Sequence, residues 1–408
     1  MRTWIWRFLG AESLPPASRK KLGVVSLLYF IQGSPPAILW EVLPVYLRFA
    51  GVSLRDIGGL RLLELPYSLK FFWSPLVQCY GDRRAWIAAC MLGIAVVVGF
   101  LPFVHVDHLA WIAVLLLLLT TFSATQDIAI DSYTVGLTSR EEEGAVNGVR
   151  ASAYRLALVT LGGGMVFLAA VLSWRPIYLA AAVVFGCLAL LAPLAPRLDL
   201  PRGAREHWLS GFVGWVGTWR AVPLVLFVLT YKLGEFAIGP MVKPFWVDQG
   251  RSLFEIGLVP TTFGIVLSVA GALSGGAFVS RFGTFNGIWA LGLLQAVSNL
   301  GYALVDWAGL GRMGLYGASV FESYSGGLGT AAFLAFLMNI CEREHATTQY
   351  AFLSSIFSLT GRLVGGVSGL GAERFGYGNY FALTFLLSLP AYALLPWVKA
   401  WIHDKPRD

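Results

Sequence analysis

The sequence predicts an all-α polytopic membrane protein with twelve transmembrane helices in two six-helix bundles. The 408-residue chain is 57% hydrophobic and only 13% charged, which is about half the charged share of a soluble protein. Its apolar residues form unbroken blocks of about 20, the length that a helix needs to cross a bilayer. They do not alternate with polar residues as the strands of a membrane barrel would.

Twelve hydrophobic spans fall into two halves, separated by the longest polar segment. In the N-terminal bundle, assigned to residues 22–195, they lie near 22–47, 57–79, 86–104, 109–135, 147–172 and 176–195. In the C-terminal bundle, assigned to residues 221–400, they lie near 221–246, 255–280, 285–306, 315–340, 347–370 and 378–399. The segment 196–220 is predicted to be a cytoplasmic linker, and residues 1–21 and 401–408 cytoplasmic tails.

The basic residues predict the orientation. Lys and Arg concentrate before the first span, in the linker and after the last span, as at Lys20, Lys21, Arg202, Arg205 and Lys405. Because cytoplasmic loops carry the excess of Lys and Arg, both termini are predicted to lie in the cytoplasm. The formal charge of +7 does not indicate a nucleic-acid partner, because these residues flank apolar blocks and form no basic stripe.

The two halves share one pattern. Residues 137–164 and 339–369 each begin with a loop rich in Arg and Glu, followed by a span with an interior Arg and a glycine cluster. Two similar six-helix bundles are typical of transporters that rock around a site at the membrane midplane. We therefore expect a monomeric secondary transporter in the lipid bilayer, with a small-molecule substrate.

The fourth span carries two acidic residues, Asp127 and Asp131, which face the same way because they are four residues apart. A carboxylate at bilayer depth costs several kcal/mol unless it is paired or hydrated. An antiparallel turn centred near residues 140–141 would place Asp127 opposite Arg155 and Asp131 opposite Arg150. Asp131 is best explained as a structural partner of Arg150. For Asp127, two interpretations stay open: a fixed ion pair, or a carboxylate that binds a proton when its cavity is wet.

Other ionisable side chains lie inside the predicted spans. The second span contains Glu64 and Lys70, and the first contains a Gly-Ser-Pro-Pro break at 33–36, which is best tolerated where backbone borders a cavity. The later spans contain Lys232, Glu235, Glu322 and Arg362. Because charge that faces lipid is strongly disfavoured, we expect most of these side chains to line the transport cavity.

Several other classes of protein are disfavoured. The glycine-rich patches contain no GxxxxGK[ST] phosphate loop and are better explained by close helix packing. The histidines lie in loops or at span ends, and the cysteines lack metal-ligand spacing, so no metal site is expected. A membrane-embedded enzyme would need a dense acidic or histidine cluster near one membrane surface, and the sequence has none.

Four motifs resemble the AmpG-type muropeptide permeases, a branch of the major facilitator superfamily with acetyl-CoA transporter and siderophore importer relatives. They are SATQDIAIDSY, LPYSLKFFWSPL, YKLGEFAIGPM and GGLGTAAFLAFLMNICEREHATTQYAFLSS. The resemblance covers residues 22–400. It implies the major facilitator fold and import across the bacterial inner membrane, driven by the proton motive force and without a cofactor. The cargo it implies is N-acetylglucosaminyl-anhydro-N-acetylmuramyl peptide, a cell-wall recycling product.

The resemblance also assigns positions. The family's helix-four signature corresponds to Ala124, Thr125, Gln126, Asp127 and Asp131, and its seventh-span signature to Lys232, Leu233 and Gly234. The family's gate latch after the second span usually reads like DRYGRRR, whereas this chain has QCYGDRRAW, so Asp82 with Arg83 and Arg84 would have to replace it. The chain ends after twelve spans, a short form also common among siderophore importers.

These observations predict a proton-coupled symporter that imports anhydro-muropeptides by alternating access. An importer of a ferric siderophore or similar aromatic chelate is the alternative. The proton-coupling candidates are Asp127, which we favour, Glu64, Glu235 and Glu322. The substrate-binding candidates are Gln32, Lys70, Gln126, Tyr154, Arg155, Tyr231, Lys232, Asn339 and Arg362. The gating candidates are Asp82, Arg83, Arg84, Asp131 and Arg150.

Overall fold

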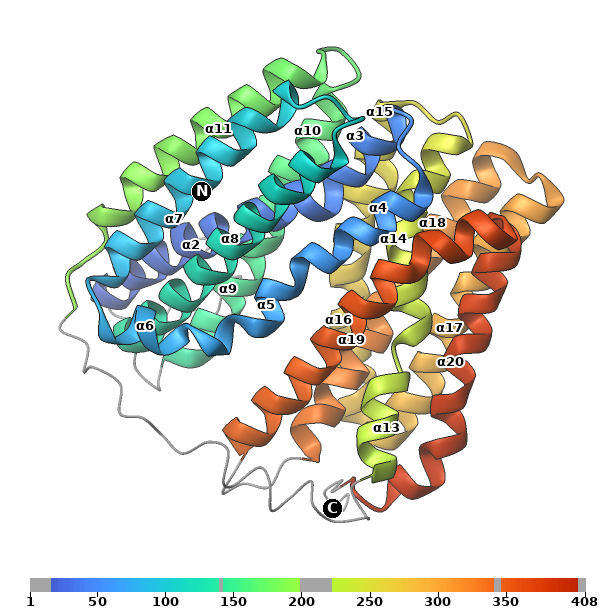
Figure 1. The fold of residues 1–408 in the computed structure, drawn as a ribbon. Helices are drawn as coiled ribbons and strands as arrows, with labels where there is room; N and C mark the ends of the chain where they lie inside the picture. The colour runs from blue at the N-terminus through green and yellow to red at the C-terminus, as the bar shows by residue number, and fades with distance from the viewer. Residues whose placement is uncertain (1–15, 139–141, 199–221, 341–345, 403–408) are drawn as a thin grey trace. The chain divides into compact units, whose positions relative to one another are not determined.

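The computed structural model describes residues 16–138, 142–198, 222–340 and 346–402, which are almost entirely helical (Figure 1). The chain divides into two compact units, one of Met1–Ala50 with Leu63–Ala204 and one of Gly51–Leu62 with Arg205–Asp408. Residues 51–62 therefore group with the second unit, although they precede most of the N-terminal bundle in the sequence. The predicted linker and tails lie mostly outside the described residues.

Among its described residues, the first unit contains six helical stretches, several of them interrupted; the second stretch begins at Arg61, two residues before the unit boundary at Leu63. They are α2 (Pro16–Pro36), η1 (Ala37–Val42) and α3 (Leu43–Phe49); η2 (Arg61–Glu64), α5 (Leu65–Leu69), η3 (Lys70–Phe72) and α6 (Ser74–Cys79); α7 (Arg83–Phe100) and η4 (Leu101–Phe103); α8 (Leu109–Leu137); α9 (Glu143–Ala157), η6 (Leu158–Gly163) and α10 (Gly164–Leu168); and α11 (Trp174–Leu191) with η7 (Ala192–Leu194). Within this unit α7 and α11 lie side by side (Figure 1), and α2 packs against both α8 and α9.

The second unit begins with a short helix from the N-terminal half of the chain. Its elements are α4 (Leu54–Leu60); α13 (Val222–Thr230) and α14 (Leu233–Asp248); α15 (Leu253–Ile256), η9 (Gly257–Phe263) and α16 (Gly264–Phe282); α17 (Thr284–Ala308); α18 (Gly311–Asn339); α19 (Ala346–Phe375); and α20 (Tyr377–Lys399). Helix α4 packs on α19, because Gly58 and Gly369 allow contact between the two backbones: a Cβ atom at Gly369 would lie 1.8 Å from the Leu54 carbonyl oxygen.

Nine segments of the described chain are long and apolar enough to cross a membrane. The other three predicted spans, 57–79, 315–340 and 347–370, are also helical. The first of these is broken into short helices, and α18 is rich in Gly and Ser, which lowers its hydropathy. The helical fold class is confirmed, whereas the number of twelve transmembrane helices stays a prediction.

Glycine allows α16 and α18 to pack closely, as the sequence predicted. A Cβ atom at Gly271 would lie 2.1 Å from the Tyr324 carbonyl oxygen, and one at Gly327 would lie 2.1 Å from the Ser268 carbonyl oxygen. In a membrane the hydrophobic effect does not drive helices together, so they associate through close packing, which small residues allow by bringing the backbones together.

The second span is interrupted where Pro66 and Pro75 remove backbone donors. Hydroxyl groups of α8 bond to this irregular stretch. Thr120 Oγ1 donates to the Leu63 carbonyl oxygen at 2.7 Å, and Trp73 Nε1 donates to Thr125 Oγ1 at 3.0 Å. Partners supplied by a neighbouring helix are what allow a broken helix to persist in a membrane.

Helices α13 and α14 are separated by a break at Tyr231 and Lys232. Gly234 follows it because no larger residue fits: a Cβ atom there would lie 2.1 Å from Ser388 Oγ and 2.4 Å from the Thr384 carbonyl oxygen of α20. The Lys-Leu-Gly sequence therefore combines a helix break with a close helix contact.

We predict that Gly234→Ala lowers the apparent melting temperature of the purified protein by several degrees, because overpacking a core costs about 1–3 kcal/mol. Gly239→Ala is the matched control on the same helix, since a Cβ atom there would meet nothing within 4 Å. Fluorescence-detected thermal unfolding measures both variants, and equal melting temperatures would contradict the proposed contact.

Candidate functional site

Two side chains of the first unit meet at Asp127 on α8. Gln32 of α2 donates a hydrogen bond from Nε2 to one carboxylate oxygen, and Lys70 of η3 donates from Nζ to the other. The Asp127 side chain is 18% exposed and the Lys70 side chain 32% exposed. One cation and one amide thus compensate the carboxylate, as a charge held away from water requires.

The predicted pairing of Asp127 with Arg155 was wrong. Although α8 and α9 are consecutive in the chain, α2 packs against both, so at Asp127 the neighbouring side chain is Gln32 of α2. The cation comes from η3, which begins at Lys70 and lies against α8. Pairing residues by their distance from a hairpin turn does not account for a third helix.

The predicted pair of Asp131 and Arg150 is confirmed. Arg150 Nη2 lies 3.2 Å from Asp131 Oδ1, and the Tyr29 hydroxyl donates a 2.6 Å hydrogen bond to the same oxygen. The Arg150 guanidinium also lies 4.5 Å from the centre of the Tyr29 ring. The part played by Tyr29 was not predicted. Its spacing of three residues from Gln32, on one face of a helix, is the sequence signal that would have indicated it.

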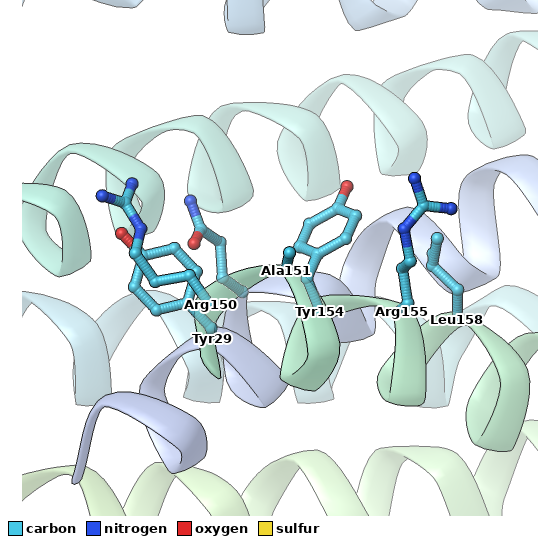
Figure 2. Close-up of a pocket in the computed structure, with 7 residues that line it drawn as sticks. Tyr29, Arg150, Ala151, Tyr154, Arg155 and Leu158 are labelled. Carbon is cyan, nitrogen blue, oxygen red and sulfur yellow. The ribbon is translucent and has the colours of Figure 1, made fainter. Parts of the chain in front are cut away.

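A pocket of about 440 Å³ opens beside this network in the first unit. Its lining residues are Tyr29, Gln32, Arg150, Ala151, Tyr154, Arg155 and Leu158. Figure 2 shows Arg150, Tyr154 and Arg155 projecting from α9 toward the same side. Gln32 belongs both to the pocket wall and to the Asp127 cluster, so a ligand in the pocket would lie one side chain away from the carboxylate.

Three polar groups at the pocket have no partner among the described residues. The Arg155 guanidinium and the Tyr154 hydroxyl form no hydrogen bond or ion pair there, and Gln32 Oε1 is buried without one. The Gln32 amide is oriented by Asp127, because an ionised carboxylate only accepts hydrogen bonds and therefore faces Nε2. The pocket thus offers a cation, a hydroxyl and an acceptor to a ligand.

The second unit contains a similar cluster at the α13–α14 break. Lys232 donates to Glu235, to Gln295 Oε1 at 2.8 Å and to Thr330 Oγ1 at 2.9 Å, and Gln295 Nε2 donates to Glu235. The Lys232 side chain is only 2% exposed. Each of its three N–H donors has an acceptor, as is typical of a buried lysine with a structural role. Gln295 and Thr330 were not predicted, although an amide within an apolar span is a recognisable signal.

Two other candidates of the first unit lie away from the pocket. Glu64 is 6% exposed and accepts a 3.1 Å hydrogen bond from Trp40 Nε1. Gln126 is fully buried, and its Nε2 lies 3.3 Å from the Met91 sulfur of α7. Neither residue lines the described pocket, and both positions suit packing between helices.

The remaining candidates of the second unit are dispersed. Tyr231 stacks on Phe333 with ring centres 5.1 Å apart and is 5% exposed. Its ring therefore packs in the hydrophobic core, where it is not placed to stack on a substrate. On α18, Glu322 accepts a 3.3 Å hydrogen bond from Ser323 Oγ, and Asn339 is the last residue. Arg362 of α19 donates to the Ser358 carbonyl oxygen at 3.1 Å.

Asp82 and Arg84 form a clamp inside the first unit. Arg84 Nη2 lies 2.5 Å from Asp82 Oδ2, while Nη1 donates to the carbonyl oxygens of Pro193 at 3.0 Å and Ala195 at 2.8 Å, beyond α11. The hydrogen bonds from Arg84 hold the pKa of Asp82 below its ordinary value. Arg83 is also buried. The described contacts thus hold together parts of one unit, and a latch function for these residues stays a prediction.

Comparison with known proteins identifies the class to which this arrangement belongs. The family model described as Major Facilitator Superfamily matches residues 25–231. A bacterial homolog of the human lysosomal transporter Spinster, in an inward-facing and unoccupied conformation, aligns with a TM-score of 0.78 at 14% identity, covering 95% of this chain and 98% of that one. The nucleoside transporter NupG aligns with a TM-score of 0.72 at 13% identity, covering 94% and 100%. The chain belongs to the major facilitator superfamily.

Within that superfamily, the chain belongs to the AmpG-type permeases. The anhydromuropeptide permease of Escherichia coli K12 is 30% identical over 399 residues, which cover 95% of this chain and 81% of the permease. The putative transporter AmpG 4 of Rickettsia conorii is 25% identical over 408 residues, covering 94% and 97%. These relatives are a permease and a putative transporter, and this chain is a transporter and not an enzyme. This protein is likewise a multi-pass inner-membrane transporter of a small molecule.

We predict that Lys70→Met destabilises the protein more than the double substitution Lys70→Met with Asp127→Asn. The single variant leaves a buried carboxylate without its cation, a loss of about 3 kcal/mol at the low end of the range for buried pairs. The double variant removes both charges. Thermal unfolding of the four proteins in this cycle measures the coupling, and equal losses in the single and double variants would show that the pair is not an energetic unit.

We also predict a pH-dependent role for Asp82. Because its pKa is lowered in the folded protein, its stabilising effect is present above the ordinary pKa near 3.9 and is lost as the pH falls through the lower folded value. Wild type should therefore melt slightly above Asp82→Asn at pH 7, and the difference should shrink as the pH falls below the ordinary pKa of the carboxyl. The effect is small because the Asp82 side chain is 48% exposed. A difference independent of pH would contradict this assignment.

Proposed function

We propose that this permease is a proton-coupled importer of peptidoglycan-derived anhydro-muropeptides, in which Asp127 carries the proton. The name of the Escherichia coli relative supports the cargo. One observation supports Asp127 as the proton site. Gln32 lines the pocket and also donates a hydrogen bond to Asp127, so a cargo bound in the pocket and the carboxylate would contact the same residue. The other cargo expected from the sequence, a ferric siderophore, finds no support among the relatives and structures named above.

Protonation changes the hydrogen bonds and the charge interaction that Asp127 forms with its neighbours. As a carboxylate it accepts from Gln32 and Lys70. As a neutral acid it gains an O–H donor and loses its attraction for the Lys70 cation. Gln32 then meets this donor with its oxygen and turns its NH₂ group toward the pocket. A proton at Asp127 in this way alters the pocket wall, and by thermodynamic reciprocity the cargo alters the affinity for the proton.

The proton motive force drives this cycle without a cofactor. In the proposal the protein acts as a monomer by alternating access, and both termini lie in the cytoplasm, as the distribution of basic residues indicates. Import then uses a proton that enters from the acidic side of the membrane and leaves to the cytoplasm. Lys232, whose three N–H donors each have an acceptor, has a structural role in the second unit in this proposal.

We predict that Asp127→Asn abolishes proton-driven accumulation of anhydro-muropeptide but preserves exchange between labelled and unlabelled cargo, because a neutral amide keeps the site but cannot cycle a proton. The measurement is uptake into proteoliposomes with an imposed pH gradient, followed by counterflow without a gradient. Asp107→Asn is the control, since that carboxylate of the same unit is 81% exposed. Accumulation by Asp127→Asn at the wild-type level would exclude Asp127 as the proton carrier.

A further inference from the structure

The pocket of the first unit contains a cation that the described residues leave uncompensated. Arg150 is paired with Asp131, and nearby Lys70 is paired with Asp127. Arg155 has no such partner among the described residues, although it is half-buried in a membrane-spanning segment. Charge in that setting is disfavoured unless something compensates it, so an anionic ligand is the natural partner of Arg155.

The neighbouring groups restrict the kind of anion. A guanidinium presents a fork of donors that fits the two oxygens of a carboxylate, and the Tyr154 hydroxyl can donate as well. Gln32 Oε1, buried without a partner, only accepts hydrogen bonds. A ligand that satisfies all three groups carries a carboxylate next to an N–H or O–H donor.

A close contact between α2 and α9 sets the positions of the three residues that carry these groups. Gly33 brings α2 against α9, where a Cβ atom would lie 2.7 Å from the Tyr154 carbonyl oxygen and 3.0 Å from Ala157 Cβ. The main-chain positions of Gln32, Tyr154 and Arg155 are therefore fixed relative to one another by this contact. Such preorganisation lowers the conformational cost of binding.

The volume limits how much cargo the pocket receives. At about 440 Å³ it is near the lower end of the range of about 300–1,000 Å³ that holds a drug-sized ligand. A disaccharide with an attached peptide is larger than this, so the pocket suits one part of it, such as a sugar with its acidic side arm.

We propose that this pocket is a carboxylate-binding subsite, in which Arg155 and Tyr154 hold the carboxylate and Gln32 Oε1 accepts from an adjacent amide or hydroxyl. The proposal rests on the proposed function and names the chemical group of the cargo that this unit recognises. A muropeptide carries carboxylates next to amide N–H groups, whereas a neutral sugar does not.

The test compares two small probes, N-acetylmuramic acid and its methyl ester, in which a neutral ester replaces the anionic carboxylate. Binding at pH 7 is measured by thermophoresis on the full-length protein in nanodiscs of phosphatidylcholine, which supplies no anionic headgroup to compete for Arg155. Wild type should bind the acid at least about tenfold more tightly than the ester, the factor expected for a charge-assisted hydrogen bond.

Substitution of Arg155 should remove this preference. Arg155→Gln is expected to bind acid and ester equally and weakly, and Arg155→Lys to keep part of the preference, since it retains the charge but not the fork. Arg175→Gln is the control, because that exposed arginine packs over Phe103 and should leave the preference intact. All variants should melt near wild type, because Arg155 has no partner to lose among the described residues.

Three results would overturn the subsite: no binding of the acid by wild type, equal binding of acid and ester by wild type, or a preference that survives in Arg155→Gln. Uptake of anhydro-muropeptide by wild-type proteoliposomes tests the cargo separately. A preference for the acid without muropeptide uptake would refute the proposed function and keep the subsite, whereas uptake without the preference would refute the subsite alone.

Discussion

A carboxylate within a membrane bundle must be matched by a cation and by hydrogen-bond donors before helices can pack around it, and Asp127 imposes this requirement on the first unit. Its cation, Lys70, reaches it from a stretch of the second span that prolines have broken. In the same broken stretch the Leu63 carbonyl oxygen accepts a hydrogen bond from Thr120 of α8, and the Trp73 side chain donates one to Thr125. The charge, the irregular span and the hydroxyls that precede Asp127 in the sequence are thus parts of one arrangement.

Both units contain a carboxylate that accepts hydrogen bonds from a lysine and a glutamine, but the surroundings of the two carboxylates differ. In the second unit, Lys232 is almost fully buried and each of its donors has an acceptor, so a change in charge would leave an uncompensated group. In the first unit, Asp127 and Lys70 retain some exposure, and Gln32 adjoins a pocket with unpartnered groups. In the proposed mechanism, the same chemistry gives a fixed support in the second unit and a proton-binding site in the first.

Features that depend on one segment, or on two segments joined by a short turn, could be predicted from the sequence. The helical class, the glycine contacts of α18 and the pair of Asp131 and Arg150 all follow from hydropathy, small residues or proximity to a turn. The partner of Asp127 could not be predicted in this way, because it depends on α2 packing against both α8 and α9. For the same reason the pocket, which α2 and α9 form together, is not visible in either segment alone.

The contact between Gly33 and the Tyr154 main chain has a consequence for how the cargo preference of such a permease changes in evolution. It fixes the residues that link the pocket to the carboxylate, whereas Ala151 and Leu158 border the same pocket without a polar role. Exchanges at these two positions would reshape the pocket while leaving the ionic cluster as it is. If the pocket binds cargo as proposed, apolar substitutions along α9 change the cargo preference and leave the cluster at Asp127 unchanged.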